Sequence, residues 1–506
     1  MTNKTGALTR RHVHGLLLGA TALAAWGGVA SAQADQTLVV AQTSDAQPAN
    51  ILPGRAGNWP WRTNVFETLA YLDPETFEPV AQLATDWQVS DDKLSMDITL
   101  RDDVTFHTGR KMTAEDVKWS FETAASPESS SQVGFIARDF AAIEVTGDTT
   151  LTIRFSHPTG NIFDFFEFTS ILDRETYDNR TDGSQVVGTG PYRFVSWTPG
   201  ASVVLERFDG YRDPEAAAIP RIEFAVIGDP TAVVSALRSG RAAVAYGLPS
   251  NQLIEFDRNP MYQTIDGGGV IYPFGVNVTT PPFDVKEVRQ AVQYAIDRQR
   301  IVDQVFDGKG TATDLFWSPT SPGYSEDLAT QYAYDPEKAR QMIEAAGATA
   351  ATVKIVVPAI PANRSIFEIV QNNLREVGLS PEAEVLEVAD YDKRQVAGDL
   401  GQAFILIHGQ VGFSSTTLIS SLPSLREGNP SQFWSEEYQT LRAAMDAAQT
   451  TDEQAKAVAD LSEYMNDQAF NLALLQTPNS TVISSDLKGM TMNRFGGLNF
   501  ANATLN

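Results

Sequence analysis

Few residues of this 506-residue chain belong to types that commonly catalyse reactions or bind metals. It contains no cysteine, which excludes disulfides, thiolate metal sites, cysteine nucleophiles and a lipidated N-terminal cysteine. Only His107, His157 and His408 follow the first 32 residues. The sequence has neither an H-E-x-x-H zinc motif nor a G-x-S-x-G nucleophile elbow. We therefore expect no enzyme activity, no metal and no cofactor.

Gly188-Thr189-Gly190 is the one segment that suggests a phosphate-binding loop. Such a loop leads into a helix, whose free N–H groups bind the anion. Here the glycines lead into Pro191 and then into Tyr192–Trp197, where apolar and polar residues alternate as in a strand. The pattern favours a structural corner before a strand over a nucleotide site.

Composition limits the possible partners. The formal net charge is −25 at pH 7, with 42% hydrophobic and 20% charged residues. A chain this acidic repels nucleic acids and anionic membrane surfaces, so we expect neither as a partner. Its length is enough for two to four domains.

The N-terminus has the three parts of an export signal. Lys4, Arg10 and Arg11 precede the apolar segment Gly15–Val29, and Ala30-Ser31-Ala32 is a small-residue cleavage site. The apolar segment is shorter than the roughly 20 residues that a membrane-spanning helix needs. The arginine pair resembles a twin-arginine signal, which leaves the export route open between that pathway and general secretion. We expect cleavage near Ala32, giving a protein outside the cytoplasm that is not a lipoprotein. Its net charge would be −25 − 3 = −28.

Strand and helix patterns alternate along the rest of the chain. Expected strands are 37–41, 94–101, 150–155, 192–197, 201–207, 221–226, 270–277, 353–357, 382–388 and 404–407. Expected helices are 61–71, 113–122, 230–238, 285–306, 335–346, 365–377, 438–449 and 452–468. Three consecutive glycines, Gly267–Gly269, precede strand 270–277 and could form a flexible joint.

Several short motifs in a fixed order resemble the family 5 extracellular solute-binding proteins of ABC importers. They are NVFETL (64–69), LATDW (83–87), LRDDVTFHTG (100–109), TAEDV (113–117), GTGPY (188–192), LRSG (237–240), FDVKEVRQA (283–291) and YDPEKA (334–339). Each motif alone is weak, but the ordered series extends over roughly residues 38–489.

The resemblance implies an α/β periplasmic binding protein fold, in which two hinged lobes close on a ligand. It places lobe I at 33–70, 187–275 and 484–506, and lobe II at 276–483. A small flanking domain, 71–186, would be inserted in lobe I, and Gly267–Gly269 would form part of the hinge. The implied function is a monomeric periplasmic receptor that delivers a small ligand to an ABC permease.

In this family the ligand lies between the lobes, against three segments. The first corresponds to residues 50–62, where tryptophan can stack on a ligand and arginine can pair with an anion. The second is 361–365, at the start of the expected helix 365–377, where Arg364 matches the arginine that holds the ligand carboxylate in dipeptide receptors. The third is 407–417. The expected ligand-binding residues are Arg55, Asn58, Trp59, Arg62, Phe274, Asn277, Arg364, His408, Gln410, Val411, Phe413 and Ser414.

One departure from the family pattern bears on the ligand. Peptide receptors carry an aspartate for the ligand ammonium at the position of Val411, and no acid occurs between Leu406 and Arg426. A buried ammonium without a carboxylate partner is costly. Arg364 with Val411 therefore indicates an anionic or polyhydroxyl ligand, such as an opine, a sugar conjugate or a modified peptide. An ordinary peptide receptor with an acid elsewhere, for instance Asp45 or Glu67, is the alternative. A hydrolase using His408 and a neighbouring serine is a remote third hypothesis.

Overall fold

The computed structural model describes residues 36–409 and 411–506. The expected signal segment 1–32 and Gln410 lie outside the described residues. Residues 37–506 form one unit with three larger β-sheets covered by helices, which confirms the α/β class. We name three parts of this unit after their sheets: lobe I, the flanking domain and lobe II.

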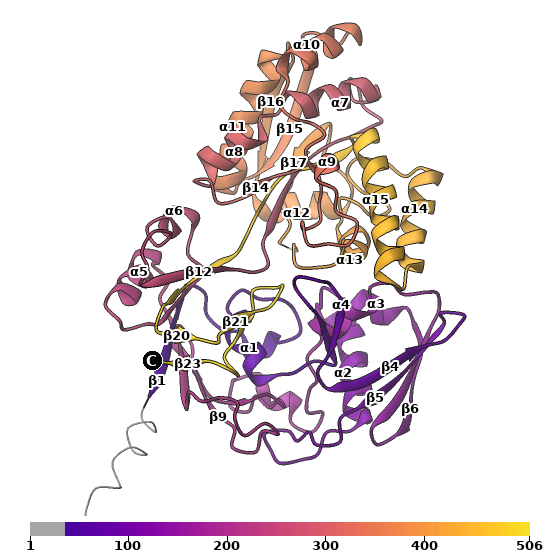
Figure 1. Cartoon of the computed structure of the whole chain (residues 1–506). Helices are drawn as coiled ribbons and strands as arrows, with labels where there is room; N and C mark the ends of the chain where they lie inside the picture. Colours follow the sequence, from indigo (N-terminus) through magenta and orange to yellow (C-terminus); the bar gives the residue numbers. More distant parts are fainter. Residues whose placement is uncertain (1–35, 410) are drawn as a thin grey trace, which may run out of the picture. The chain divides into compact units, whose positions relative to one another are not determined.

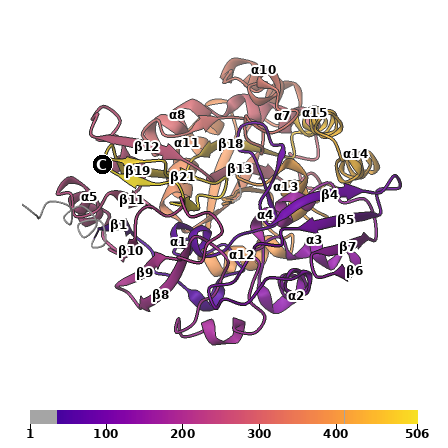
Figure 2. The same cartoon turned by 60° about the horizontal axis from the view of Figure 1, so that its bottom comes forward.

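The sheet of lobe I is mixed, because its central strand β1 (Thr37–Gln42) pairs in parallel with β10 and β11. Figure 2 shows the strands in the order β12, β19, β11, β1, β10, β9 and β8. The other strands are β8 (Tyr192–Thr198), β9 (Ser202–Arg207), β10 (Arg221–Val226), β11 (Val244–Tyr246), β12 (Tyr262–Asp266) and β19 (Ser480–Ser484). Its helices are α1 (Trp59–Val65), α5 (Pro230–Arg238), α6 (Ser250–Leu253) and the 3-10 turn η1 (Pro48–Asn50). Two short ribbons complete it: β20 (Leu487–Lys488) with β23 (Thr504–Leu505), and β21 (Thr491–Met492) with β22 (Leu498–Asn499).

Lobe II is built on a second mixed sheet, with the order β14, β18, β13, β17, β15 and β16. The strands are β13 (Val270–Val276), β14 (Thr311–Ala312), β15 (Thr352–Pro358), β16 (Ser380–Leu386), β17 (Ala403–Ile405) and β18 (Asn471–Thr477). The helices are α7 (Lys286–Ala295), α8 (Arg298–Val305), α9 (Glu326–Ala329), α10 (Pro336–Ala345), α11 (Pro361–Glu376), α12 (Val388–Val396), α13 (Ser415–Ser421), α14 (Glu436–Ala447) and α15 (Thr451–Gln468).

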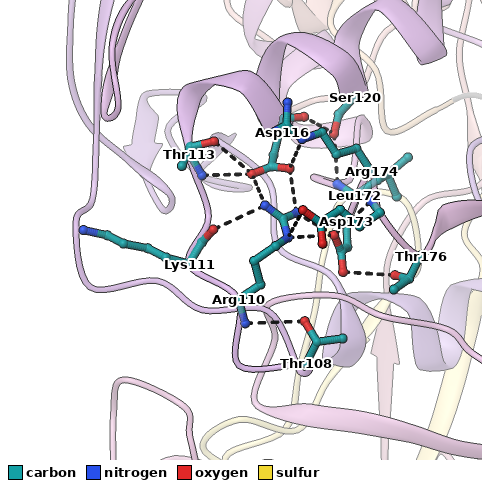
Figure 3. Close-up of polar contacts among 11 residues, drawn as sticks. Thr108, Arg110, Lys111, Thr113, Asp116, Ser120, Leu172, Asp173, Arg174 and Thr176 are labelled. Atoms are coloured by element: carbon teal, nitrogen blue, oxygen red, sulfur yellow. Dashed lines mark hydrogen bonds and ion pairs between the residues drawn. The ribbon is translucent and has the colours of Figure 1, made fainter.

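The flanking domain contains the antiparallel sheet β4-β5-β7-β6. Its elements are β2 (Ala70–Leu72), β3 (Pro79–Ala81), β4 (Ala84–Val89), β5 (Ser95–Leu100), α2 (Ala114–Ala125), η2 (Pro127–Ser129), α3 (Gly134–Arg138), β6 (Phe140–Gly147), β7 (Thr150–Phe155), α4 (Ile162–Phe168) and η3 (Tyr177–Arg180). Thr113 and Asp116 form the capping box that the sequence predicts for α2. Figure 3 shows the same aspartate paired with Arg110, which also binds Asp173 and so fastens the segment after α4 to α2.

The chain crosses between the two large sheets at two adjacent places. Residues 267–269 connect β12 to β13, and residues 478–479 connect β18 back to β19. The Gly267 N–H donates to the Asn479 carbonyl at 3.1 Å, so the crossovers are hydrogen-bonded to each other. β13 therefore belongs to the lobe II sheet and β19 to the lobe I sheet. The expected boundaries at 275/276 and 483/484 lie later in the chain than these crossovers.

The expected long helix 285–306 is wrong, since α7 ends at Ala295 and α8 begins at Arg298. Asp297 between them accepts a hydrogen bond from the Arg300 N–H and caps the second helix. The expected helix 61–71 is α1, which ends at Val65 before strand β2. Across residues 36–409 and 411–506, no helix combines the length and apolarity that crossing a membrane requires.

The Gly188–Gly190 segment is a packed corner, as predicted. A Cβ on Gly188 would lie 2.0 Å from the Val65 carbonyl oxygen at the end of α1, and one on Gly190 would lie 2.4 Å from that of Asn64. His107 Nε2 lies 3.0 Å from the Gly190 oxygen, and His107 Nδ1 accepts from the Gly188 N–H. Burial lowers the pKa of His107 to about 4. The corner holds β8 against α1 and leaves no room for a phosphate.

Candidate functional site

A cavity of about 370 Å³ lies beside α1 and the C-terminal ribbons of lobe I; we call it the Arg62 cavity. Its walls come from α1, from the segments around β2 and the end of α4, and from the loop between β21 and β22. The lining residues are Trp59, Arg62, Thr63, Phe66, Thr68, Tyr71, Leu72, Asp73, Pro74, Gln82, Glu167, Ser170, Thr491, Met492, Asn493, Arg494, Gly497 and Asn499.

Arg62 is a buried cation without a carboxylate partner among the described residues. It lies in the last turn of α1 and is only 4% exposed. Its Nε donates to the Ser170 hydroxyl at 3.1 Å and its Nη2 to the Phe168 carbonyl, while Nη1 has no partner within the described chain. The guanidinium also lies 5.2 Å from the ring centres of Trp59 and Phe168. Burial lowers its pKa to about 10, so the group stays charged at neutral pH.

Arg494, the other arginine of this cavity, is fully compensated. Its Nη2 lies 3.0 Å from Asp164 Oδ1 and 2.5 Å from Glu167 Oε2, and Nη1 donates to the Gly412 carbonyl. Burial raises the pKa of Glu167, and the attraction to Arg494 opposes that shift. Both carboxylates pair with Arg494, and neither forms an ion pair with Arg62.

Hydrogen-bond acceptors are present for two other buried arginines, Arg298 and Arg289, and for the half-buried Arg212. Arg298 pairs with Asp314 at 2.8 Å, and Arg212 pairs with Glu67 at 2.5 Å. Arg289 lacks a carboxylate but donates to the Gln468 and Phe283 carbonyls. Arg289 lines neither the Arg62 cavity nor the pockets beside it. Arg62 differs from all three by having an unsatisfied Nη1 and a cavity beside it.

Four aromatic rings from separate segments meet next to Arg62. The Trp59 ring stacks on Phe495 at 5.9 Å and meets the edge of Phe168 at 5.4 Å. Phe413 lies 4.7 Å from Phe495 and 5.3 Å from Phe168. A small pocket of about 70 Å³ separates this cluster from Gly268, Gly269 and Gly409. Trp59 and Phe413, both expected from sequence, are therefore brought together across two parts of the fold.

Val411 lines a second cavity of about 330 Å³, which we call the hinge cavity. The crossover residues Asp266, Gly267 and Gly268 form another of its walls. Met492, Asn493 and Arg494 line both the hinge cavity and the Arg62 cavity, so the two spaces adjoin. Val411 and Gly412 contribute no charge to this cavity, whereas Asp266 and Arg494 line it with one charge of each sign.

His408 is buried in lobe II rather than facing either cavity. Its Nε2 lies 3.0 Å from the Ser424 hydroxyl, and its backbone pairs with Ile271. Ser424 is completely buried, and burial lowers the pKa of His408 to about 4. A substrate cannot reach this His–Ser pair, so the structure gives the hydrolase hypothesis no support.

The remaining expected residues are dispersed. Arg55 and Arg364 are exposed, and neither side chain has a partner among residues 36–409 and 411–506. Asn58 is buried and bonds to Gln47 and Asn50, which fixes the loop before α1. Phe274 lies in the lobe II core, and Asn277 accepts from Thr279 in a turn. Ser414 caps α13 and donates its hydroxyl to Asp164 at 2.5 Å. Gln410 lies outside the described residues.

Sequence reasoning missed Ser170, Glu167 and Arg494, three of the residues that line the Arg62 cavity. The motif series stops near residue 489, before the turn that holds Arg494. One signal was present in that turn: Asn493-Arg494-Phe495-Gly496-Gly497 puts a single arginine in a glycine-rich turn, a composition typical of a loop that carries function.

The described parts of the chain contain no group of three or more His, Cys, Asp or Glu side chains that could hold a metal ion. The donors that the structure does assemble are guanidinium, hydroxyl and amide groups around aromatic rings. Such a set can orient an organic solute with an anionic group through hydrogen bonds and stacking.

Comparison with known proteins identifies related solute-binding proteins. A profile of bacterial extracellular solute-binding proteins, family 5 (middle), matches residues 78–427. Heme-binding protein A of Haemophilus influenzae is 26% identical over 487 residues, covering 89% of this chain and 88% of that protein. Glutathione-binding protein GsiB of Salmonella typhimurium is 29% identical over 271 residues, 52% of each chain. The fold of HbpA2 from Haemophilus parasuis superposes with a TM-score of 0.83 at 24% identity, covering 93% of this chain and all of that one.

The fold is thus that of the two-lobed periplasmic binding proteins. The relatives are binding proteins of ABC importers and not enzymes. Family members bind small ligands in the periplasm and deliver them to ABC transporter permeases. Since the matched profile covers most of its length, this chain belongs to the bacterial extracellular solute-binding proteins, family 5.

Proposed function

We propose that this chain is the receptor of an ABC importer for a small solute with an anionic group, and that Arg62 binds that group. One observation carries the proposal: Arg62, which lines a cavity of about 370 Å³, is only 4% exposed, has no carboxylate partner in the described chain and has a buried Nη1 without a hydrogen bond. Burying a charge without a counter-charge costs several kcal/mol. An anionic ligand would supply the counter-charge and remove that cost, which would increase its affinity.

The surroundings of Arg62 specify the anion further. Ser170 and Trp59 contact the guanidinium, and Gln82, Asn493 and Asn499 add neutral polar groups to the cavity wall. A planar carboxylate can pair with a guanidinium while the rest of the molecule stacks on an aromatic ring. Opines, acidic sugar conjugates and modified peptides have this chemistry. Arg364 on α11 remains a candidate for a second contact from lobe II.

The peptide alternative needs a carboxylate for the ligand ammonium. Asp45 already accepts from Trp197 Nε1 and the Gly200 N–H, and Glu67 is held by Arg212 and Tyr211. Asp266 is a better candidate, because it lines the hinge cavity and contacts only the Ser480 hydroxyl. One relative is named as a glutathione-binding protein, and glutathione is a peptide with an ammonium group and carboxylates. A peptide receptor is therefore the second candidate function.

The test is a ligand screen with matched arginine variants. Glutathione, dipeptides, opines, sugar acids and Ni²⁺ chelates are screened by thermal shift, and each hit is measured by titration calorimetry. For an anionic hit, Arg62→Met should lower affinity by about tenfold or more, since a buried charge contact typically contributes 1.4 kcal/mol or more. The control is Arg55→Met, an exposed arginine of the same segment, which should bind as the parent does.

Two outcomes would contradict the proposal. The first is an anionic ligand whose affinity is the same in the parent and in Arg62→Met. The second is a screen in which only cationic or neutral solutes bind. Binding of free dipeptides that Asp266→Asn weakens would instead establish the peptide reading. The receptor's expected monomeric state and cleavage near Ala32 are checked in the same preparation, by light scattering and by the mass of the exported protein.

A further inference from the structure

A larger cavity, about 490 Å³, lies between the flanking domain and lobe II; we call it the Trp87 cavity. In Figure 1 it corresponds to the region where the loop between α14 and α15 approaches α4 and β4. Its lining residues are Leu72, Phe77, Glu78, Pro79, Trp87, Val89, Gly160, Asn161, Phe163, Asp164, Ser414, Gln449, Thr450, Thr451, Asp452 and Gln454. Leu72 also lines the Arg62 cavity, so the two spaces adjoin.

Three uncharged polar groups in these walls have no partner within residues 36–409 and 411–506. They are the side-chain amides of Asn161 and Gln449 and the indole N–H of Trp87. Asn161 is only 7% exposed. It occupies the residue before α4, where asparagine usually caps the helix, yet its side chain makes no capping hydrogen bond. The amide atoms of Asn161 are not sealed from solvent and have no protein partner in the described chain, so a donor and an acceptor are available to a ligand.

The apolar wall of the cavity is aromatic. Trp87 is half-buried and meets the edge of Phe163 at 5.2 Å, which fixes the orientation of its ring. Phe77 is buried and lies in the same wall. An aromatic ring beside hydrogen-bonding amides can stack on the apolar face of a ring-shaped ligand while the amides bind its edge.

The charges of the wall exclude an anionic occupant. No lysine, arginine or histidine is among the described lining residues, whereas Glu78, Asp164 and Asp452 are. Two of these carboxylates already accept hydrogen bonds, Glu78 from Thr451 and Asp164 from Ser414. A cation would leave the free N–H groups of Asn161, Gln449 and Trp87 unsatisfied, since it has no acceptor to offer. Hydroxyl groups both donate and accept, so they can satisfy the amides and the carboxylates together.

We infer that the Trp87 cavity binds a neutral, hydroxyl-rich, sugar-like group, stacked on Trp87 and hydrogen-bonded to Asn161 and Gln449. The inference rests on the proposed function only in taking the chain to be a solute receptor. The group could belong to the solute whose anionic end reaches Arg62, because the cavities share Leu72. It requires no anion, however, and so can be tested alone.

The experiment uses maltose, cellobiose, sucrose and myo-inositol as neutral probes, titrated into the exported protein by calorimetry and by tryptophan fluorescence. Trp87→Leu and Asn161→Ser remove the ring and the free amide. Trp119→Leu is the matched control, because Trp119 is also half-buried in the flanking domain but packs on Tyr177 away from the cavity. Putrescine serves as a cationic probe.

The expected result is saturable binding of at least one hydroxylated probe, weakened about tenfold or more by Trp87→Leu and by Asn161→Ser but unchanged by Trp119→Leu. The inference is overturned if no hydroxylated probe binds at concentrations up to about 10 mM, or if both cavity variants bind as the parent does. Putrescine binding that depends on Trp87 would also overturn it. Arg62→Met should leave neutral probes unaffected, so a failure of the Arg62 proposal and a failure of this one are distinguishable.

Discussion

At the scale of single residues, the two arginines of the Arg62 cavity have opposite electrostatic situations. Arg494 forms ion pairs with two buried carboxylates, whereas Arg62 is paired with neither. Removing one member of a buried ion pair leaves an uncompensated charge, while removing an unpaired charge does not. The same substitution should therefore have different consequences at the two positions.

The prediction is that, without ligand, Arg494→Met lowers the free energy of unfolding by about 3–5 kcal/mol. Arg62→Met should cost less by at least about 2 kcal/mol, because only the contacts to Ser170 and Phe168 are lost. Urea unfolding followed by circular dichroism gives both values. Equal losses in the two variants would show that Arg62 has a counter-charge after all.

Two histidines, the buried His408 and the half-buried His107, make stability depend on pH. Burial lowers the folded-state pKa of His107 and of His408 to about 4, from the ordinary value of 6.5. Between pH 4 and pH 6.5 the unfolded chain binds more protons than the folded chain does. The contribution of each neutral histidine to the free energy of unfolding is therefore fully present above pH 6.5 and is lost as the pH falls toward 4. Each histidine should lower the free energy of unfolding by about 1 kcal/mol between pH 7 and pH 5.5.

Urea unfolding at the two pH values measures this loss. His408→Gln should reduce the pH dependence by the share of that histidine, and the double variant with His107→Gln should reduce it further. His157→Gln is the control, since His157 is exposed. A pH dependence that survives the double variant would have to come from other groups.

At the residue scale the sequence predicted part of the site. The family resemblance predicts Trp59, Arg62 and Val411 as ligand-binding residues. Trp59 and Arg62 line the Arg62 cavity, and Val411 lines the hinge cavity next to it. The isolation of Arg62 was not predictable, because it depends on Ser170 and on the engagement of Glu167 by Arg494, residues far away in the chain. Asn58 and Phe274 are of residue types that suit ligand binding as well as Trp59 and Arg62 do. Only the tertiary structure shows that Asn58 bonds to the loop before α1 and that Phe274 packs in the core.

At the scale of elements, local patterns predicted some strands and helices to the residue, α5 among them, but missed others such as β6 and β18. β7 and β10 coincide with the expected ranges, since alternation persists over a strand's whole length. The break between α7 and α8 was missed because apolar spacing continues through it, although Asp297 supplies a cap there. The crossover before β13 coincides with the predicted joint Gly267–Gly269, whereas the expected lobe boundaries at 275/276 and 483/484 lie later in the chain than the crossovers.

The corner at Gly188–Gly190 yields an element-scale prediction. A Cβ at Gly188 or Gly190 would meet the backbone of α1, which cannot move without displacing the helix end. Gly188→Ala and Gly190→Ala should each lower the free energy of unfolding by about 1–3 kcal/mol, the usual cost of overpacking. The matched control is Gly228→Ala, because a Cβ there meets nothing within 4 Å. Thermal and urea unfolding compare the three variants; a destabilised control or two unaffected corner variants would contradict the steric explanation.

At the scale of the whole unit, one loop of lobe II connects all three parts. Ser414 donates its N–H and hydroxyl to Asp164 of the flanking domain, and Gly412 accepts from Arg494 of lobe I. Arg494 itself lines the Arg62 cavity, so the contacts that hold the lobe II loop adjoin the proposed ligand position. Farther out, Lys93 pairs with Glu453 and Thr451 donates to Glu78 across the same boundary. Exposed pairs of that kind contribute little, which leaves the Ser414–Asp164–Arg494 contacts as the main polar connection.

Loosening that connection should shift the protein toward an open arrangement, with the crossovers 267–269 and 478–479 acting as the hinge. Ser414→Ala removes the hydroxyl that binds Asp164, and Ser420→Ala is the control, because Ser420 lies on the same helix without a side-chain partner in the described chain. In small-angle X-ray scattering without ligand, Ser414→Ala should have the larger radius of gyration, and Ser420→Ala should match the parent. For any solute held between the lobes, the apparent Kd of Ser414→Ala should rise by the same factor by which the population of the closed state falls. That factor is a few-fold for the loss of about 1 kcal/mol. An unchanged radius of gyration together with an unchanged Kd would mean that the loop contacts do not control closure. The crossovers themselves would then set the free-energy difference between the open and closed states.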